Sequence, residues 1–406
     1  MENHQERAMK LATEAGHILL ENGAEISRVE DTMRRIATAY NVDEKSFFVL
    51  SNGIIATARD YAKAECIPIK GTQLSRVVDV NQLSRDVVDG RCTLDELEKR
   101  LHDIRNSKAK PAWERIVGVT IGVSAFCINF GGSFMDSFVT LVVGLLLGTY
   151  MAYFGKNMSR IFNSLTCGIV GGLLCVGAYH IATALIDTPV HLANMIIGTI
   201  IALVPGVPFT NGMRDLANED YIAGSTRLID ALITFLCIAI GVVLALKIDN
   251  LLFGDLLKQE WPVVDSVTSA WYIQLAAAFV GTASFSIIFG APRKYYLECG
   301  FVGMIGWAVY IFTSSVFLAA MSVALIAHAF AGYRHCPVTV FMICGIIPLV
   351  PGGGIFWTSY FVVTNQLLLA ADTGFNAVKA AISIAGGIIV MTAVFYRILR
   401  KYKLKV

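Results

Sequence analysis

Two short segments rich in proline and glycine are the part of this sequence best suited to bind a solute. The first contains Pro205, Gly206 and Pro208, and the second contains Pro351 and the glycines of 352–354. Proline removes a backbone donor and glycine resists helix continuation, so both segments predict interrupted helices. An interrupted helix exposes amide N–H groups for a carboxylate and carbonyl oxygens for a cation. The alternative is a proline kink that only shapes packing.

Hydroxyl and amide side chains follow each break. Thr210 and Asn211 follow the first one, and Thr358 and Ser359 follow the second. They could hydrogen-bond a small polar solute, although such residues also join helices to one another in membranes. The predicted binding residues are Pro205, Gly206, Thr210, Asn211, Pro351, Gly352, Thr358 and Asp136.

Three carboxylates in or beside apolar segments are candidates for proton coupling, namely Asp136, Asp230 and Glu298. Ionisable groups within a membrane are functional by default. Asp136 could also hold a substrate ammonium group, but an aspartate at a helix start is equally an ordinary cap. Asp230 follows Arg227 by three residues, so the alternative for Asp230 is an ion pair with Arg227 at the membrane rim.

The sequence contains no motif for disulfide, metal, nucleotide or hydrolytic chemistry. The nine cysteines form no CxxC pair and no zinc spacing, so neither a disulfide framework nor a metal site is expected. No nucleotide-binding, HExxH or GxSxG pattern is present, and no cofactor is expected. The formal net charge of +2 argues against a nucleic-acid partner.

The distribution of charge divides the 406 residues into two parts. Hydrophobic residues make up 55% and charged residues 16%, which is more apolar and less charged than a soluble protein. Of the charged residues, 35 lie in the first 110 positions and 29 in the remaining 296. We therefore predict a cytosolic domain over 1–110, followed by a membrane body.

The body contains ten apolar segments, each near the ~20 residues that a spanning helix needs. The segments are 114–131, 137–154, 161–186, 191–210, 227–247, 269–290, 295–312, 314–331, 337–356 and 377–397.

An internal repeat relates the two halves of the body. LVPG occurs at 203–206 and again at 349–352, an offset of 146, and IGVSAFCINFGG at 121–132 aligns with VGTASFSIIFGA at 280–291, an offset of 159. The predicted units cover 111–250 and 265–406. Five helices per unit would invert the second copy in the membrane.

Loop charges agree with this inversion, because cytosolic loops are enriched in Lys and Arg. The loop after the first helix of copy one has no Lys or Arg, whereas its counterpart carries Arg293 and Lys294. After the second helix, copy one carries Lys156 and Arg160 and copy two has none. The fold class predicted is therefore a polytopic α-helical membrane protein with two inverted five-helix repeats, ten transmembrane helices and cytosolic termini. Inverted repeats with matching helix breaks are typical of secondary transporters with a midplane site.

The first 110 residues predict a small α+β domain. Apolar spacing indicates helices around 11–19 and 26–36, while 47–58 and 64–80 read as strands with a hairpin at Asn52-Gly53. Thr93 and Glu96 form a capping box for a last helix. The charged helix beginning near Glu25 is either a functional face or a solvated helix with internal ion pairs.

Several motifs together resemble the threonine/serine exporter family in its fused form, over nearly the whole chain. They are NGAEISRVEDTMRRIA (22–37), the segment 211–232 after LVPG, FGAPRK (289–294) and LVPGGG (349–354). Glu219 stands where the family pattern leads us to expect a Gly-Asp pair, and Asp220 is retained. The resemblance implies a cytosolic N-terminal domain, ten transmembrane helices and export of threonine and serine driven by protons. Some relatives, split into two chains, are associated with dicarboxylate export.

The first hypothesis is thus a proton-coupled secondary exporter of threonine and serine in the cell membrane, with no enzymatic activity. A dicarboxylate (succinate-like) exporter is the runner-up, disfavoured because the deep segments contain almost no Lys or Arg. A membrane-anchored hydrolase that uses the N-terminal domain is a third hypothesis, and a domain that senses cytosolic solute is a fourth. The expected partners are a small polar solute, protons and lipid, and the oligomeric state stays open, a homo-oligomer included.

Overall fold

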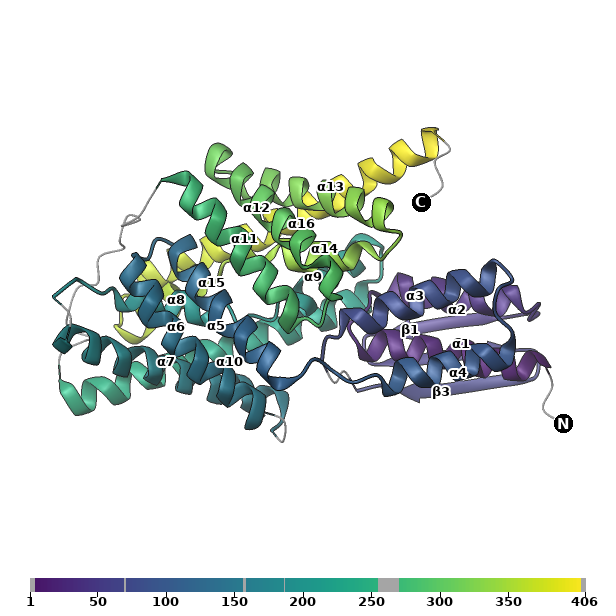
Figure 1. The fold of residues 1–406 in the computed structure, drawn as a ribbon, viewed down its shortest axis with the longest axis horizontal. Coiled ribbons are helices and arrows are strands. Elements are labelled where there is room, and N and C mark those ends of the chain that lie inside the picture. Colours follow the sequence, from purple (N-terminus) through teal and green to yellow (C-terminus); the bar gives the residue numbers. More distant parts are fainter. Residues whose placement is uncertain (1–3, 69–70, 156–157, 186, 255–269, 403–406) are drawn as a thin grey trace.

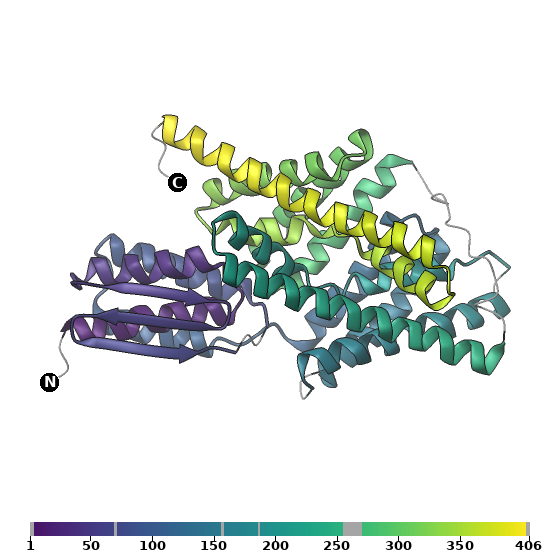
Figure 2. The same ribbon diagram turned by 180° about the vertical axis from the view of Figure 1, so that it is seen from behind.

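The computed structural model describes residues 4–68, 71–155, 158–185, 187–254 and 270–402, and every structural statement below concerns these residues. They form a small mixed unit of helices and strands and a larger helical body beside it (Figures 1 and 2). We call residues 4–106 the head and residues 112–402 the body. The C-terminal end of the body lies at the same end of the molecule as the head in both views.

The head packs four helices against one face of a three-stranded sheet (Figure 2). The strands β1 (Ser46–Leu50), β2 (Gly53–Ala58) and β3 (Tyr61–Cys66) are antiparallel in the order β1-β2-β3. Phe47 and Ile54 point into the core, whereas Phe48 and Ile55 on the opposite face are exposed. This alternation follows from the two-residue period of a strand. The helices are α1 (His4–Glu21), α2 (Ile26–Ala39), α3 (Leu74–Val88) and α4 (Leu94–Asn106).

The hairpin and the capping box are confirmed, but the strand prediction for 64–80 is wrong beyond Cys66. Leu50 pairs with Gly53 across the hairpin, and Thr93 and Glu96 cap α4 reciprocally. From Leu74 the chain is helical instead. The buried residues Leu74, Val77, Val80, Leu83 and Val87 recur every three or four positions, so a helix buries them on one face and a strand could not. The β-branched valines obscured this period.

In the part of the body that the structure describes, seven helices are long and apolar enough to cross a membrane. They are α6 (Phe134–Tyr153), α7 (Arg160–Leu185), α10 (Tyr221–Phe253), α11 (Trp271–Ile288), α12 (Tyr296–Thr313) with the preceding turn η2 (Arg293–Tyr295), α13 (Val316–Arg334) and α16 (Leu367–Tyr402). The body is therefore a polytopic helical membrane unit. The first predicted segment forms α5 (Ala112–Asn129), which begins with a charged turn.

Both predicted helix breaks are present. Residues 191–210 form α8 (Leu192–Ile200) and the start of α9 (Gly206–Ala217), and Pro205 caps α9. The later segment forms α14 (Val338–Gly345), the turn η3 (Ile347–Leu349) and α15 (Gly352–Val363), with Pro351 as the cap. The α14–η3 segment and α15 meet at an angle of 46°, and counting them as one broken span gives eight candidate spans.

Corresponding helices of the two halves pack in the same pairs. In the first half α5 packs on α6, α7 on α10 and α9 on α10; in the second half α11 packs on α12, α13 on α16 and α15 on α16. The helices α5 and α11 pack directly on each other. At their crossing the Phe126 and Phe285 rings lie 5.0 Å apart. Each ring covers a glycine of the other helix: Phe126 covers Gly281, and Phe285 covers Gly122.

Candidate functional site

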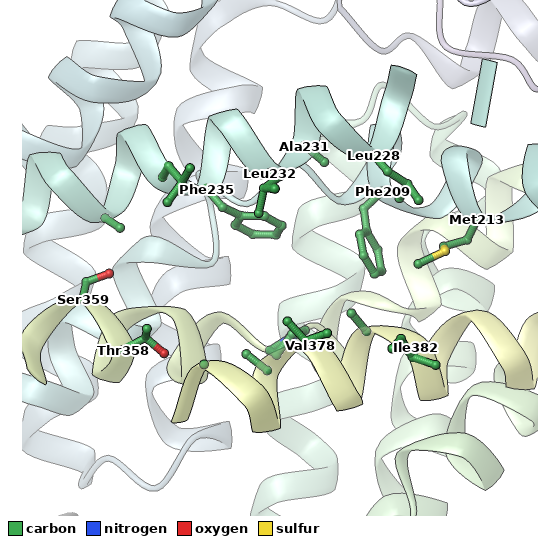
Figure 3. Close-up of a pocket in the computed structure, with 16 residues that line it drawn as sticks. Phe209, Met213, Leu228, Ala231, Leu232, Phe235, Thr358, Ser359, Val378 and Ile382 are labelled. Carbon is green, nitrogen blue, oxygen red and sulfur yellow. The ribbon is translucent and has the colours of Figure 1, made fainter. Parts of the chain in front are cut away.

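A cavity of about 360 Å³ lies between the two broken segments and the long helices that follow them. Helices α9 and α10 form one side and α15 and α16 the other (Figure 3). The aromatic rings of Phe209 and Phe235 point into the gap, and Val378 and Ile382 face them from α16. Leu232 and Ile382 are more than half exposed, so the cavity opens on the outer surface of the body.

The lining residues come in pairs that the internal repeat relates. At the offset of 146 residues, lining positions on α10 correspond to lining positions on α16, and Met213 of α9 corresponds to Ser359 of α15. The α10–α16 pairs are Leu228 with Gly374, Ala231 with Ala377, Leu232 with Val378, Phe235 with Ala381, and Leu236 with Ile382. The cavity therefore lies where the two halves meet, and both halves contribute equivalent positions to it.

Most of the cavity wall is apolar, and its polar side chains lie at one end. Thr358 and Ser359 lie together there, whereas Phe209 and Met213 lie at the other end (Figure 3). The Thr358 hydroxyl donates to the Gly354 carbonyl oxygen at 2.7 Å and lies 3.1 Å from the Thr373 hydroxyl. Pro351 also lines the cavity. The first turn of α15 therefore starts at the cavity wall, and the N–H groups of a first turn have no acceptor within their own helix.

The candidates on α9 lie beside the cavity rather than in its wall. Pro205 and Gly206 begin the helix whose Phe209 and Met213 line the cavity. Thr210 is fully buried, and its hydroxyl has no hydrogen-bond partner among the described residues. Asn211 is also buried, and its side-chain amide donates to the Gly23 carbonyl oxygen of the head at 2.7 Å. The structure thus brings Pro351, Gly352 and Thr358 to the cavity region and turns Asn211 towards the head.

Asp136 lies away from the cavity and is bonded to a histidine. It caps α6 in a box with Ser133, whose backbone N–H donates to Asp136 Oδ2 at 2.7 Å. The His191 backbone N–H donates to Asp136 Oδ1 at 2.7 Å, and His191 Nδ1 lies 3.0 Å from Oδ2. Asp136 is fully buried and the His191 side chain is 24% exposed, so Asp136 is both part of the α6 cap and the hydrogen-bond partner of a half-buried histidine.

Glu298 and Asp230 also form ion pairs outside the cavity. Glu298, in the first turn of α12, bonds to Arg334 at the end of α13. Asp230 pairs with Arg160 of α7 at 2.5 Å. The expected pair of Asp230 with Arg227 is therefore wrong. The Arg227 guanidinium bonds instead to Asp215 of α9 at 2.6 Å and to the Ala24 carbonyl oxygen of the head at 3.0 Å.

A buried network of charged and polar groups joins the head to the broken helix α9. Glu25, which precedes α2, bonds to Arg214 of α9 and accepts from Arg28 Nε at 2.9 Å. Asp215, also on α9, accepts from the Ile26 backbone N–H at 3.2 Å. These are the residues of the NGAE and NGMRD motifs, which lie nearly 190 positions apart in the chain.

The long helix α10 completes this network. Arg227 bonds to Asp215 and donates through Nη2 to the Ala24 carbonyl oxygen at 3.0 Å. Asp215 is fully buried and the Arg227 side chain is 5% exposed. Breaking such a pair by removing one partner leaves an uncompensated buried charge and costs roughly 3–5 kcal/mol. The network therefore fixes the head against α9, the helix that also carries Phe209 and Met213 of the cavity.

The second half of the body also holds the head through backbone contacts. The Leu74 N–H donates to the Phe289 carbonyl oxygen at 3.0 Å, and the Ser75 N–H donates to that of Gly290 at 2.9 Å. A Cβ atom at Gly290 would lie 3.1 Å from Gln73 Cα, and Gly290 has a φ of +65°. Glycine is therefore required twice at this position, for conformation and for space. The head contacts both halves of the body.

The structure reveals functional candidates that the sequence reasoning missed. Phe209 and Phe235 line the cavity but carry no polar group that the sequence could single out, whereas Ser359 lines it as one of the polar residues expected after the second break. No sequence signal pairs Glu25 with Arg214, because the two residues are brought together only by the fold. Within the part of the chain that the structure describes, no group of three His, Cys, Asp or Glu side chains could hold a metal ion.

Comparison with known proteins identifies the family. A model described as "Putative threonine/serine exporter" matches residues 10–249, and a second one, "Threonine/Serine exporter, ThrE", matches residues 274–394. A threonine/serine exporter of Corynebacterium glutamicum is 22% identical over 94% of this chain and 81% of the relative. A probable threonine/serine exporter of Mycobacterium tuberculosis is 21% identical over 91% of this chain and 74% of the relative.

A shorter relative comes from Klebsiella aerogenes. It is described as a probable succinate transporter subunit and is 24% identical over 60% of this chain and 95% of its own length. No solved structure matches the chain. Since the first family model alone covers more than half of the residues and the body is polytopic, this chain is a multi-pass membrane protein that belongs to the threonine/serine exporter family.

Proposed function

We propose that this chain is a proton-coupled secondary exporter of small hydroxy amino acids, threonine and serine, in the cell membrane. The observation that carries the proposal is the cavity between the two helix breaks, which is lined by repeat-related positions from both halves (Figure 3). A site shared by two repeats can open to either side when one repeat moves against the other. A volume of about 360 Å³ is within the range of small-molecule sites.

In this proposal the solute is held mostly by backbone groups. The first-turn N–H groups of α15, beside Pro351, bind the substrate carboxylate, as helix N-termini bind anions. The hydroxyl group of the substrate bonds to Thr358 or Ser359. When the substrate is threonine, its methyl group packs against Ala231 and Ala377, whose small side chains leave space in the cavity wall. In this proposal, Gly206 and Thr210 form the corresponding part of the site at the break before α9.

We further propose that the two halves are inverted repeats within ten transmembrane helices, with both termini in the cytosol. The reciprocal packing of Phe126 on Gly281 and Phe285 on Gly122 supports a two-fold relation at the α5–α11 crossing. The arginines support the proposed orientation. The arginines that contact the head and those that lie near it are at the same end of the body. They include Arg115, Arg160, Arg214, Arg227, Arg293 and Arg334. Cytosolic ends of membrane helices are enriched in arginine.

Proton coupling is proposed at the pair formed by the buried Asp136 and the half-buried His191. Histidine is the side chain whose ordinary charge change lies closest to neutral pH, which makes it a common proton carrier in proteins. The helix α8 begins directly after His191 and leads to the break before α9. Any change in the contact between His191 and Asp136 therefore acts on the segment that positions the α9 break. Glu298 and Asp230 remain alternative coupling residues, each in an ion pair at the end of the body that bears the head.

Threonine efflux from proteoliposomes tests the proposal. Vesicles that contain the full chain are loaded with labelled threonine, and an inward proton gradient should accelerate its release. Thr358→Val should raise the KM several-fold, since one hydrogen bond contributes about 0.5–1.5 kcal/mol. Thr183→Val is the matched control, because Thr183 makes the same bond to the carbonyl four residues earlier but is exposed on α7. Efflux that ignores the proton gradient would refute the coupling, and equal kinetics of the two variants would refute the site.

A dicarboxylate exporter is the second candidate, favoured by the similarity to the Klebsiella aerogenes protein. Two carboxylates call for two cationic or amide-rich subsites. The described residues that line the cavity between the breaks include no Lys or Arg, which favours a zwitterionic solute. Competition by succinate in the same efflux assay separates the two candidates: inhibition at concentrations similar to those of serine would favour the dicarboxylate.

A further inference from the structure

A second cavity lies at the seam between the head and the body, and we call it the seam cavity. Its volume is about 510 Å³, and residues from the end of α1, from α3, from the end of α4, from the linker after α4, from α5 and from the end of α11 line it. It shares no lining residue with the cavity between the helix breaks. It is therefore a cavity separate from the one proposed for the exported solute.

The charges in the seam cavity are strongly unbalanced. Of the residues that the structure describes, four cationic ones line it, and they are Arg76, Arg105, Lys110 and Arg115. The single carboxylate in its wall is Glu21, among the residues that the structure describes. A concave surface lined by one sign of charge concentrates ions of the opposite sign. The cavity is therefore built to attract an anion.

Two of the four cations have no carboxylate partner in the described part of the chain. Arg76 donates to Ser107, through Nε to the hydroxyl at 3.2 Å and through Nη2 to the carbonyl oxygen at 2.7 Å. No ion pair within 4 Å is found for the Arg115 side chain among the described residues. Arg105, in contrast, bonds to Glu14, and Lys110 lies 3.9 Å from Glu114. The guanidinium groups of Arg76 and Arg115 thus retain donors for a ligand.

The environment of Lys110 also favours an anion in the seam cavity. Burial lowers the pKa of its ammonium group, and Glu114 compensates only in part, because Arg293 also lies nearby and lowers it further. Glu114 is itself shared with Arg293. An additional negative charge in the seam cavity would stabilise the charged form of Lys110.

We propose that the seam cavity binds a phosphate-bearing anion that joins the head to the body through Arg76 and Arg115. The planar guanidinium fork matches the oxygens of a phosphate group in bidentate geometry. A phosphate monoester carries a charge of about −1.5 to −2 at pH 7 and the phosphodiester of an anionic lipid about −1, so either group balances part of the local excess. Arg76 belongs to α3 of the head and Arg115 to α5 of the body, so one bound anion bridges the two parts.

Two sources could supply this phosphate. A soluble organic phosphate reaches the cavity from the cytosol. An anionic lipid reaches it from the bilayer, where its glycerol and chains would meet the apolar wall formed by Ile287 and Ile288. Trp113, at the start of α5, is exposed, and tryptophan is enriched at the level of lipid headgroups. The chemistry recognised is the same in both cases.

The test uses the purified full chain in nanodiscs, with pyrophosphate and phosphatidylglycerol as probes. Pyrophosphate is titrated by calorimetry in phosphatidylcholine nanodiscs, and melting midpoints are compared with and without added phosphatidylglycerol. Saturable pyrophosphate binding would support a soluble phosphate. A raised midpoint with phosphatidylglycerol, without pyrophosphate binding, would support a lipid headgroup. Absence of both effects would overturn the proposal.

Variants locate the binding. Arg115→Gln should weaken it at least about tenfold, because a hydrogen bond to a charged group is lost. This substitution breaks no side-chain ion pair of the described residues, so the protein should still fold. Arg115→Lys should retain part of the affinity through its charge. Arg35→Gln, an exposed arginine on α2, is the matched control and should bind like the parent chain. Equal affinity of Arg115→Gln and Arg35→Gln would overturn the assignment.

Discussion

Glu25 and Arg214 show how single residues of the family motifs act. Each side chain is almost completely buried, and each belongs to a different part of the chain. Burial alone would make either charge unfavourable, so the two depend on each other and on Arg28. Sequence reasoning placed Glu25 on a charged helix face and offered internal ion pairs as the alternative. The Glu25–Arg28 pair agrees with that alternative, whereas the pairing with Arg214 depends on the fold.

We predict that Glu25→Gln lowers the stability of the protein by about 3–5 kcal/mol, because Arg214 is then buried without its counter-charge. The measurement is thermal unfolding of the purified chain in detergent. Asp31→Asn is the control, since Asp31 forms an exposed pair with Arg35 and should change little. The double exchange Glu25→Arg with Arg214→Glu should recover part of the loss. Equal midpoints for Glu25→Gln and Asp31→Asn would contradict the prediction.

The same carboxylate predicts a pH dependence. Burial raises the pKa of Glu25, but Arg214 and Arg28 lower it by more, so its pKa lies below the usual value. A group with a lowered pKa in the folded state stabilises the protein above its unfolded pKa of about 4.3 and loses this contribution below it. The unfolding midpoint should therefore fall more steeply with pH below about 4.3 in the parent chain than in Glu25→Gln. Parallel curves would contradict this.

Glu219 predicts a stabilising substitution. Its φ is +68°, a left-handed conformation that costs an L-residue roughly 1–2 kcal/mol. Glu219→Gly should therefore stabilise the protein by up to about 1 kcal/mol, after the greater flexibility of the unfolded glycine chain is subtracted. Asp103→Gly within α4 is the control and should destabilise. A lower midpoint for Glu219→Gly would show that the side chain has another role.

At the scale of elements, the sequence predicts what has a strong local signal. Proline and glycine predict both helix breaks, and α9 and α15 begin directly after the expected prolines, Pro205 and Pro351. The valine-rich α3 resembles a strand in the sequence, because valine favours strands and its valines mask the helical period. The cavity between the breaks could be predicted only in part, since Phe209 and Phe235 are core-like residues whose role appears when α10 and α16 are placed face to face.

The crossing of α5 and α11 predicts a strong dependence on glycine. A methyl group at Gly122 would overlap the Phe285 ring, which is itself buried. Gly122→Ala should therefore destabilise the protein by about 1–3 kcal/mol through overpacking. Gly177→Ala is the matched control, because Gly177 lies in α7 with open space around its Cα, and alanine there should be neutral or slightly stabilising. Thermal unfolding compares the two, and equal effects would contradict tight packing at the crossing.

At the scale of the whole molecule, the arrangement of charge predicts the orientation in the membrane. Lys294 lies beside Arg293, after the end of α11 that contacts the head. Asp187 follows α7 and lies at the opposite end of the body. In a cysteine-free background, Asp187→Cys should react with a membrane-impermeant maleimide on intact cells. Lys294→Cys should react only after the cells are opened. Labelling of both positions from the same side would refute the proposed orientation.

The seam between head and body also constrains how the protein is made. The head is synthesised first, but Arg214 and Arg227 follow their partners Glu25 and Ala24 by 189 and 203 positions. At about 5–20 residues per second, the ribosome needs roughly 10–40 s to supply them. During that time Glu25 and the adjoining turn have no partner from α9 or α10. We therefore expect the nascent head to stay sensitive to protease until α10 has entered the membrane, which a pulse-chase with limited proteolysis would reveal.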